Sequence, residues 1–251
     1  MEFIPAIDLL DGKSVRLLRG DYAQVSYYEE PSLTLRAFAK AGVNWAHIVD
    51  LDAARGGVSN NRMLIERLLA ETNMQIEVGG GVRSLADVAA LANLGVRRVI
   101  VGTKAVSDLK LFGDMCAAYP GVMAAGIDYR RVKEARLCAL NGWTDYSDVE
   151  LMDAISKVID AGTSAIVLTD ISRDGTLEGP DLATLVEVGE ITNRHGIDLI
   201  SSGGVSSVDD LVTIGTSTST VGSIFGCISG KAVHEGIIDL EEAVRSCRMF
   251  E

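Results

Sequence analysis

The sequence contains few cysteines and histidines, and those present are far apart. Its 251 residues include four cysteines and three histidines. The cysteines form no Cys-x-x-Cys pair, and His47, His195 and His234 are well separated. Because a zinc site needs clustered ligands, this scatter predicts no metal site. For the cysteines we expect reduced, mostly buried thiols in a cytoplasmic protein.

Positive charge is also scarce. The chain carries 35 acidic and 23 basic residues, a formal net charge of −12, and no run of lysine or arginine. Nucleic-acid binders generally present a basic face to the phosphates. We therefore expect no nucleic-acid partner, and we attribute the excess acid to a solvated surface that aids solubility.

Long apolar segments do not occur either. A membrane-spanning helix needs about 18 or more apolar residues in succession, and no such stretch is present. The opening residues Met-Glu-Phe-Ile-Pro contain no basic segment followed by a long apolar run, so we expect no signal peptide. These features predict a cytoplasmic location and no membrane partner.

Short apolar runs alternate regularly with amphipathic segments. Runs rich in β-branched residues are typical of strands buried on both faces, and apolar steps of three and four residues are typical of helices. The predicted strands are Phe3–Ile7, His47–Val49, Gln75–Val78, Arg98–Val101, Val122–Ile127, Ala165–Leu168, Asp198–Ser201 and, roughly, Ser223–Ser229. The predicted helices include Leu33–Ala41, Asn61–Ala70, Leu85–Leu94 and Asp148–Ala161, and the polar cluster Thr216–Thr220 is predicted to be a loop.

Eight strand–helix alternations in about 250 residues predict an α/β protein whose residues 1–251 form a single (βα)8 TIM barrel. An open, doubly wound sheet is the alternative. The sequence has no Gly-x-Gly-x-x-Gly and no P-loop motif, so no feature calls for the folds that bind dinucleotides or nucleoside triphosphates.

The two halves of the chain resemble each other. Ile4-Pro-Ala-Ile-Asp8 corresponds to Ala124-Ala-Gly-Ile-Asp128, and Val78-Gly-Gly-Gly-Val82 corresponds to Ser201-Ser-Gly-Gly-Val205. Two further pairs, His47–Gly57 with Ile166–Thr176 and Val101–Val106 with Ser229–Val233, keep the same order in both halves. This repeat predicts a barrel built from two similar half-barrels, roughly residues 1–120 and 121–251.

Two aspartates are the strongest catalytic candidates. The active site of such a barrel lies at the carboxyl ends of the strands. Asp8 and Asp128 end the first and fifth predicted strands, which face each other across the barrel. Each could cap a turn or a helix. A pair related by the internal repeat favours general acid and general base catalysis on a ligand between them.

Glycines follow four of the predicted strands. Their backbone N–H groups can approach a phosphate closely, and barrels often bind phosphate after strands seven and eight. Tight turns also need glycine, but two equivalent groups predict a ligand with a phosphate at each end. The residues concerned are Gly81, Gly102 and Thr103 in the first half, and Gly203, Gly204, Ser229 and Gly230 in the second.

The remaining candidates are Arg16, Arg83, Trp143, Thr169, Asp174 and Gly175. Each arginine could pair with a phosphate or carboxylate, or form a surface ion pair. The tryptophan could stack on a flat ring or pack on the barrel rim. The last three lie in Thr-Asp-Ile-Ser-Arg-Asp-Gly-Thr, which fits a loop that contacts substrate and also an ordinary Asp-Gly turn.

Several segments together resemble one known family. They are Ile-Pro-Ala-Ile-Asp-Leu, Gly-Lys-Ser-Val-Arg-Leu, Val-Asp-Leu-Asp-Ala-Ala, Val-Gly-Gly-Gly-Val-Arg, Arg-Val-Ile-Val-Gly-Thr, Gly-Ile-Asp, Asn-Gly-Trp, Thr-Asp-Ile-Ser-Arg-Asp-Gly-Thr and Ser-Gly-Gly-Val-Ser-Ser. In this order, from Ile4 to about Val244, they resemble the phosphoribosyl isomerases of histidine biosynthesis, the ProFAR isomerases.

The resemblance implies a barrel enzyme with neither a metal nor an organic cofactor. Its bis-phosphorylated small-molecule substrate, the aminoaldose ProFAR, would undergo an Amadori-type rearrangement to the aminoketose PRFAR by acid/base catalysis. By position, Asp8 would be the general base and Asp128 the general acid, although the two roles could be exchanged. Thr169 and Asp174 would assist at the sugar, and each glycine group would hold one phosphate. We expect a monomer.

Alternatives remain within this resemblance. A bifunctional relative also isomerises phosphoribosylanthranilate in tryptophan biosynthesis, but it tends to carry arginine where this chain has Asn141, which favours a single activity. The sister cyclase typically begins Cys-Leu-Asp, whereas this chain has Ala6-Ile7-Asp8. A non-catalytic phosphosugar-binding barrel would not need both aspartates. The eighth strand, Phe-Gly-Cys-Ile-Ser-Gly-Lys-Ala, departs from the family's usual Ile-Val-Gly and leaves the donors to the second phosphate open.

Overall fold

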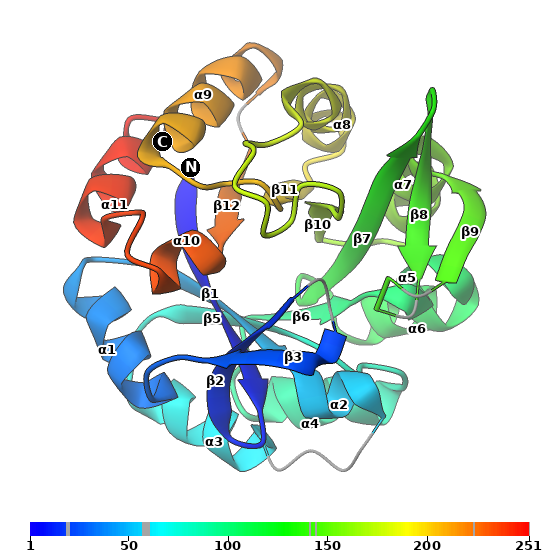
Figure 1. Cartoon of the computed structure of the whole chain (residues 1–251). Helices are drawn as coiled ribbons and strands as arrows, with labels where there is room; N and C mark the ends of the chain where they lie inside the picture. The colour runs from blue at the N-terminus through cyan, green and yellow to red at the C-terminus, as the bar shows by residue number, and fades with distance from the viewer. Residues whose placement is uncertain (19–20, 57–60, 141, 144, 223, 251) are drawn as a thin grey trace.

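A computed structural model describes residues 1–18, 21–56, 61–140, 142–143, 145–222 and 224–250. In these residues eight parallel strands form a closed barrel with helices around it (Figure 1). The order is β10–β11–β12–β1–β4–β5–β6–β7, and pairing of β7 with β10 closes the ring. The strands are β1 (Glu2–Leu10), β4 (Trp45–Asp50), β5 (Gln75–Gly79), β6 (Arg98–Val101), β7 (Met123–Val132), β10 (Ala165–Asp170), β11 (Asp198–Ser202) and β12 (Gly226–Ser229). The predicted TIM barrel is confirmed, and its division into half-barrels stays a prediction.

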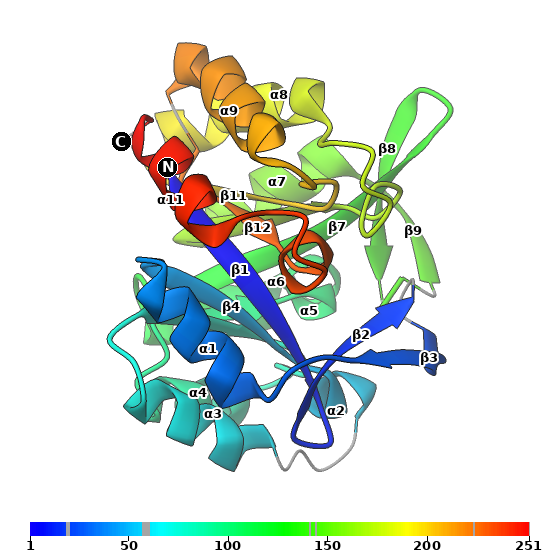
Figure 2. The same ribbon diagram turned by 60° about the vertical axis from the view of Figure 1, so that its left-hand side comes forward.

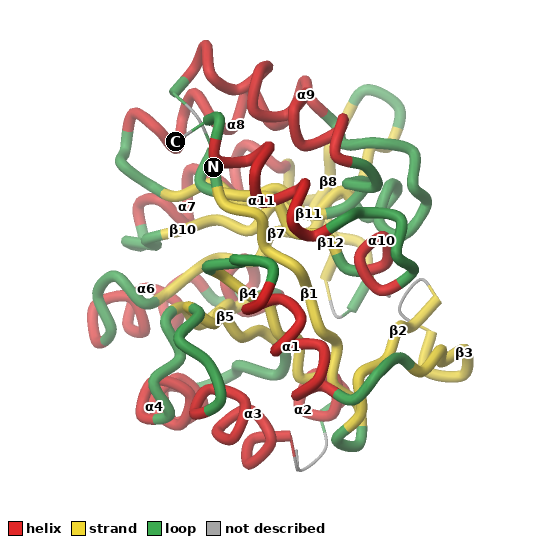
Figure 3. The backbone as a smooth tube through the Cα atoms, turned by 90° about the vertical axis from the view of Figure 1, so that its left-hand side faces the viewer, coloured by secondary structure: helices red, strands yellow, loops and turns green. Residues whose placement is uncertain are grey.

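Helices connect the barrel strands and cover their outer face (Figure 3). They are α1 (Pro31–Lys40), α2 (Leu51–Arg55), α3 (Asn61–Ala70), α4 (Leu85–Asn93), α5 (Thr103–Ser107), α6 (Leu109–Ala118), α7 (Leu151–Asp160), α8 (Leu182–Arg194), α9 (Val208–Thr218), the 3-10 turn η1 (Ser219–Val221), α10 (Lys231–His234) and α11 (Leu240–Arg248). Two helices at equivalent places in the repeat start alike. Ser84 and Ser207 each accept a hydrogen bond from an aspartate N–H three residues on, which caps α4 and α9.

Two apolar layers build the core. The larger one packs the outward faces of the strands against the helices, with Phe3, Ile7 and Leu9 of β1 among its members. The smaller one fills the inside of the barrel with side chains such as Ile4 and Ala6. Because side chains alternate along a strand, Asp8 points to the same side as Ile4 and Ala6. The barrel interior therefore leads up to Asp8.

Two antiparallel hairpins extend the barrel at its carboxyl-terminal end (Figure 2). β2 (Lys13–Leu18) and β3 (Asp21–Tyr27) continue from β1, and β8 (Ala135–Leu140) and β9 (Asp145–Glu150) continue from β7. The sequence patterns did not predict these hairpins. They carry Arg16 and Trp143, so they bring two of the candidate side chains to the barrel mouth.

Three predicted boundaries were wrong. The segment Thr216–Thr220 is helical, because its hydroxyls bond back to the helix: Thr218 donates to the carbonyl of Ile214 and Thr220 to that of Ser217. Residues 148–150 belong to β9, so α7 begins at Leu151. The eighth strand starts at Gly226, and Ser223 lies outside the described residues.

No helix in the described part of the chain combines the length and the apolar character needed to cross a membrane. All four cysteines are free and buried. Burial raises the pKa of the Cys116 thiol to about 11 and that of Cys138 to about 12. These thiols are therefore protonated at neutral pH and contribute to packing.

Candidate active site

Asp8 and Asp128 lie at equivalent positions on facing barrel strands. Asp8 follows Ile4 and Ala6 at two-residue steps on β1, and Asp128 follows Ala124 in the same way on β7. Ile4, Ala6 and Ala124 all belong to the apolar layer inside the barrel. Both carboxylates therefore point into the barrel mouth, as predicted.

Asp8 is mostly buried and partly neutralised. Its side chain is 18% exposed, and its Oδ2 lies 3.9 Å from Nη1 of Arg16. Burial raises the pKa of Asp8 to about 6; Arg16 and His47 oppose the rise, and Asp174 adds to it. This carboxylate is ionised at neutral pH and takes up a proton just below it.

Asp128 has a different set of partners. Its Oδ2 accepts a hydrogen bond from Nε1 of Trp143 at 2.9 Å, and it is also hydrogen-bonded to the Thr169 hydroxyl. Thr169 is its direct neighbour on β10. Burial raises the pKa of Asp128 and Asp174 adds to the rise, while the Trp143 and Thr169 hydrogen bonds and His47 lower it. Raising the pKa of a carboxyl is what a general acid requires.

Arg16 and Asp174 complete the mouth. Nη2 of Arg16 lies 2.5 Å from Oδ2 of Asp174, which sits in the loop after β10 beside Gly175. The structure thus brings together Asp8, Arg16, Asp128, Trp143, Thr169 and Asp174, all six of which were predicted from the sequence.

Below the aspartates lies a polar chain, buried at His47, Glu77 and Arg98, that sequence reasoning missed. Nδ1 of His47 lies 2.8 Å from Glu77, Glu77 accepts from Arg98 at 2.9 Å, and Arg98 donates to Asp198 at 2.7 Å. Burial raises the pKa of Glu77, but the hydrogen bonds from His47 and Arg98 outweigh it, so the pKa lies below its ordinary value. Arg98 also lies over the rings of Trp45 and Phe225, 4.6 and 4.7 Å from their centroids.

His47 could have been identified from the strand pattern alone. It lies on β4 one two-residue step beyond Trp45, which faces the inside of the barrel. The sequence analysis considered His47 only as a metal ligand, and it lacks neighbouring ligands in the sequence. In the described residues no three His, Cys, Asp or Glu side chains gather as a metal-binding group.

The paired glycines have a packing role that does not involve a ligand. Gly80 and Gly203 have φ of +98° and +85°. A Cβ at Gly203 would lie 2.7 Å from the carbonyl oxygen of Asp170, and one at Gly80 would overlap that of Asp50. Gly81 and Gly204 press in the same way on the backbones of Ala53 and Gly179. Close approach of two loops therefore requires glycine at these positions.

Gly102 and Gly230 are different. A Cβ at Gly102 would meet no described atom within 4 Å, and one at Gly230 would meet only Ala6 at 3.6 Å and Arg16 at 3.9 Å. Packing thus leaves open space above Gly102, where a ligand can approach the backbone. Thr103 begins α5 directly after it, and the Ser229 hydroxyl donates to the carbonyl of Val205.

Arg83 contacts the backbone of α2. Its Nη1 and Nη2 donate to the carbonyls of Ala53 and Ala54 at 2.9 and 2.7 Å, where α2 ends. The structure therefore gives this residue a backbone-capping contact, and a contact with phosphate stays a prediction. Asn141 lies outside the described residues.

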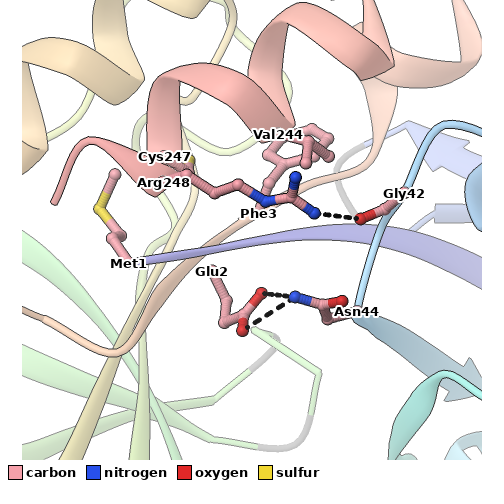
Figure 4. Close-up of a pocket in the computed structure, with 8 residues that line it drawn as sticks. All are labelled: Met1, Glu2, Phe3, Gly42, Asn44, Val244, Cys247 and Arg248. Atoms are coloured by element: carbon pink, nitrogen blue, oxygen red, sulfur yellow. Dashed lines mark hydrogen bonds between the residues drawn. The ribbon is translucent and has the colours of Figure 1, made fainter. Parts of the chain in front are cut away.

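A small pocket opens at the opposite end of the barrel (Figure 4). Asn44 donates to Glu2 there, and Arg248 donates to the carbonyl of Gly42. The pocket contains none of the predicted site residues, and the amino-terminal face of such barrels serves stability rather than catalysis.

Comparison with known proteins agrees with this geometry. Residues 2–239 match the protein family described as "Histidine biosynthesis protein". The chain belongs to this family. Similar relatives occur in Jannaschia sp. (strain CCS1), 40% identical over 98% of this chain and 99% of the relative, and in Picosynechococcus sp. (strain ATCC 27264 / PCC 7002 / PR-6), 42% identical over 98% and 93%. Both family members are named 1-(5-phosphoribosyl)-5-((5-phosphoribosylamino)methylideneamino) imidazole-4-carboxamide isomerase.

Proposed function

We propose that this chain is the isomerase of histidine biosynthesis that converts ProFAR into PRFAR. The observation that carries the proposal is the pair of mostly buried carboxylates at one barrel mouth, each with a raised pKa and its own hydrogen-bonding partners. Family membership and relatives about 40% identical over nearly the whole chain support the same activity. All four cysteines are free thiols, which suits the reducing cytoplasm.

The reaction needs one acid and one base. The acid protonates the ring oxygen of the aminoaldose, so the ring opens to an iminium. The base then removes the C2 proton, and the resulting enolamine tautomerises to the aminoketose. Each of these proton transfers contributes about 10²–10⁴ in rate. The reaction opens the sugar ring and moves protons with no net gain or loss of atoms or electrons, so acid and base side chains suffice for it.

Asp8 is assigned as the base and Asp128 as the acid. With a pKa of about 6, Asp8 is mostly ionised at neutral pH and its proton affinity is close to the working pH. Burial raises the pKa of Asp128, which favours the protonated form that an acid needs. Thr169 and Trp143 orient its carboxyl through their hydrogen bonds.

The substrate's two phosphates provide orientation. We assign one to the backbone at Gly102 and Thr103 and the other to the backbone at Gly230, which follow equivalent strands of the two halves. Binding at both ends holds the sugar between the aspartates, which lowers the entropic part of the barrier. We assign the half-buried ring of Trp143 to contact the substrate's flat imidazole.

Turnover by the purified protein on ProFAR and on phosphoribosylanthranilate, assayed in parallel, tests the proposal. Turnover of ProFAR alone supports the single-activity assignment and gives Asn141 a role in selectivity. Turnover of both substrates makes the protein a dual-pathway isomerase. Binding of ProFAR without turnover of either substrate would replace the proposal with a phosphosugar-binding barrel.

A further inference from the structure

A lysine beside the second glycine group contacts the loop that carries Asp174. Nζ of Lys231 donates to the carbonyl of Gly175 at 3.1 Å. Lys231 follows Gly230 directly and begins α10, at the end of β12 (Figure 3). One side chain therefore joins the eighth-strand loop to the residue next to Asp174.

The helix that carries Lys231 is itself fixed to the strand of Asp8. His234, the last residue of α10, bonds through Nε2 to the carbonyl of Ala6 at 2.8 Å. Its ring stacks on that of Tyr28, with centroids 4.3 Å apart and an interplanar angle of 3°. A backbone carbonyl only accepts, so Nε2 carries the proton. α10 thus has a rigid base from which Lys231 can hold the loop.

The loop of Asp174 is held at its start by β10 and at its tip by contacts from other elements. It runs over residues 171–181 between β10 and α8, and Gly175, Leu177 and Gly179 all adopt positive φ. Its first turn is held to β10, where the Asp174 N–H donates to the carbonyl of Asp170 at 3.0 Å. Farther along the loop, Arg173 Nη1 donates to the carbonyl of Gly179 at 2.9 Å. From more distant elements, Arg16 contacts the Asp174 side chain and Lys231 contacts the Gly175 carbonyl, so these two contacts hold the tip of the loop toward Asp8.

The equivalent lysine in the first half behaves differently. Lys104 follows Gly102-Thr103 as Lys231 follows Gly230, but its Nζ lies 3.7 Å from Asp108 of its own segment, and its side chain is 39% exposed. The two halves therefore place a lysine beside each glycine group and use it in two ways. This difference supplies a matched control within one molecule.

We propose that Lys231 is a positioning residue that holds the Asp174 loop in place and couples it to the phosphate at Gly230. The inference rests on the proposed function for its phosphate. An ammonium group has three donors, and one is used by Gly175, so the others can reach a phosphate oxygen beside Gly230. Phosphate binding then strengthens the contact that holds the Asp174 loop. Loss of the Lys231 amine removes one contact to the loop and one to the phosphate.

Steady-state kinetics of Lys231→Met, with Lys104→Met as matched control, tests the coupling. Losing a hydrogen bond from a charged group predicts a fall of about 10- to 100-fold in kcat/KM for ProFAR, with kcat lowered as well as KM raised. Lys231→Arg should recover much of the loss, and Lys104→Met should keep kcat. An unchanged kcat in Lys231→Met, or an equal fall in both methionine variants, would overturn the proposal.

The pH profile separates positioning from a merely structural role. The groups that act on Asp8 and Asp128 are Arg16 of β2, His47 of β4, Trp143, Thr169 of β10 and Asp174, with Tyr28 and Cys138 near them. Of these groups, Asp174 lies in the loop that Lys231 holds. The charge of Asp174 raises the pKa of both Asp8 and Asp128. Displacing Asp174 in Lys231→Met should therefore shift the kcat/KM profile to lower pH. An unshifted profile would contradict the role.

Limited proteolysis gives a readout that needs no turnover. Trypsin can cut after Arg173, whose side chain is 38% exposed. Cleavage there, followed by mass spectrometry, should be faster in Lys231→Met than in wild type, and inorganic phosphate should slow it only in wild type. Equal cleavage rates would refute the positioning role of Lys231 even if ProFAR is turned over. Faster cleavage without ProFAR turnover would support that role and refute the proposed function.

Discussion

Arg16 and Asp174 form an ion pair across the barrel mouth, with Nη2 and Oδ2 2.5 Å apart and 158 residues between them in sequence. The arginine also lies 3.9 Å from Asp8. The same pair thus places one positive and one negative charge beside the proposed base. The pKa of Asp8 depends on this balance as well as on burial.

Removing the proposed base should remove turnover and leave binding. Asp8→Asn keeps the shape of the side chain but cannot take up the C2 proton, so kcat should fall by at least about 10²–10⁴. Calorimetric binding of ProFAR should change little, because the phosphate contacts are intact. Asp114→Asn, at an exposed position on α6, is the control. Loss of the circular dichroism spectrum in Asp8→Asn would contradict the expectation, which is that turnover is lost while the fold is kept.

The acidic limb of kcat/KM should report Asp8, with an apparent pKa of about 6. The base acts as the carboxylate, so activity falls as the pH drops through this value. Arg16 lowers the pKa of Asp8 and Asp174 raises it. Arg16→Met should therefore move the limb to higher pH, and Asp174→Asn to lower pH. Shifts in the same direction would show that this pair does not tune Asp8.

Two glycine substitutions should separate packing from ligand contact. Gly80→Ala places a Cβ against the backbone of Asp50 at φ +98°, so the free energy of unfolding should fall by at least about 2 kcal/mol. Gly102→Ala meets no described neighbour, so it should cost less than about 1 kcal/mol. It should instead raise KM for ProFAR. Urea denaturation and kinetics measure both, and a Gly102→Ala variant with normal KM would argue against phosphate at that loop.

The two carboxylates that pair with Arg98, Glu77 and Asp198, should contribute unequally to the free energy of unfolding. Glu77 is wholly buried, so Glu77→Ala leaves Arg98 without its inner counter-charge and should cost about 3–5 kcal/mol. Asp198 is 43% exposed, so Asp198→Ala should cost less than about 1 kcal/mol. Denaturant titration followed by circular dichroism measures the difference. Equal losses would mean that solvent reaches Glu77 as easily as Asp198.

The barrel could be predicted because its strands are encoded locally. Each strand buried on both faces appears as a short β-branched run, and eight such runs leave few alternatives. The hairpins could not be predicted in the same way, since β1 and β7 continue into them from the barrel strands. The polar segment after Ile214 was mistaken for a loop because its hydroxyls satisfy helix carbonyls, which composition does not reveal.

The site was predicted as a set of residues but not as a set of contacts. Asp8 and Asp128 follow from their place at strand ends, and the repeat connects them. The contact of Trp143 with Asp128 depends on how a hairpin folds back, which the sequence does not specify. The glycine pairs had two explanations in the sequence, and only the neighbouring backbones of Asp50 and Asp170 show that packing requires them.

The two hairpins can change in evolution more freely than the eight strands of the barrel. β1 and β7 each have two parallel neighbours in the ring, so the attached hairpins can vary in length and sequence without breaking a bond of the barrel. The side chains that would select a substrate lie on these hairpins, whereas Asp8 and Asp128 lie on the barrel strands β1 and β7. A change of substrate among phosphoribosyl compounds then needs a new hairpin that keeps the contacts of Arg16 and Trp143 with the aspartates. A graft of the β8–β9 hairpin between relatives that retains Trp143 should transfer substrate preference while leaving the reaction the same.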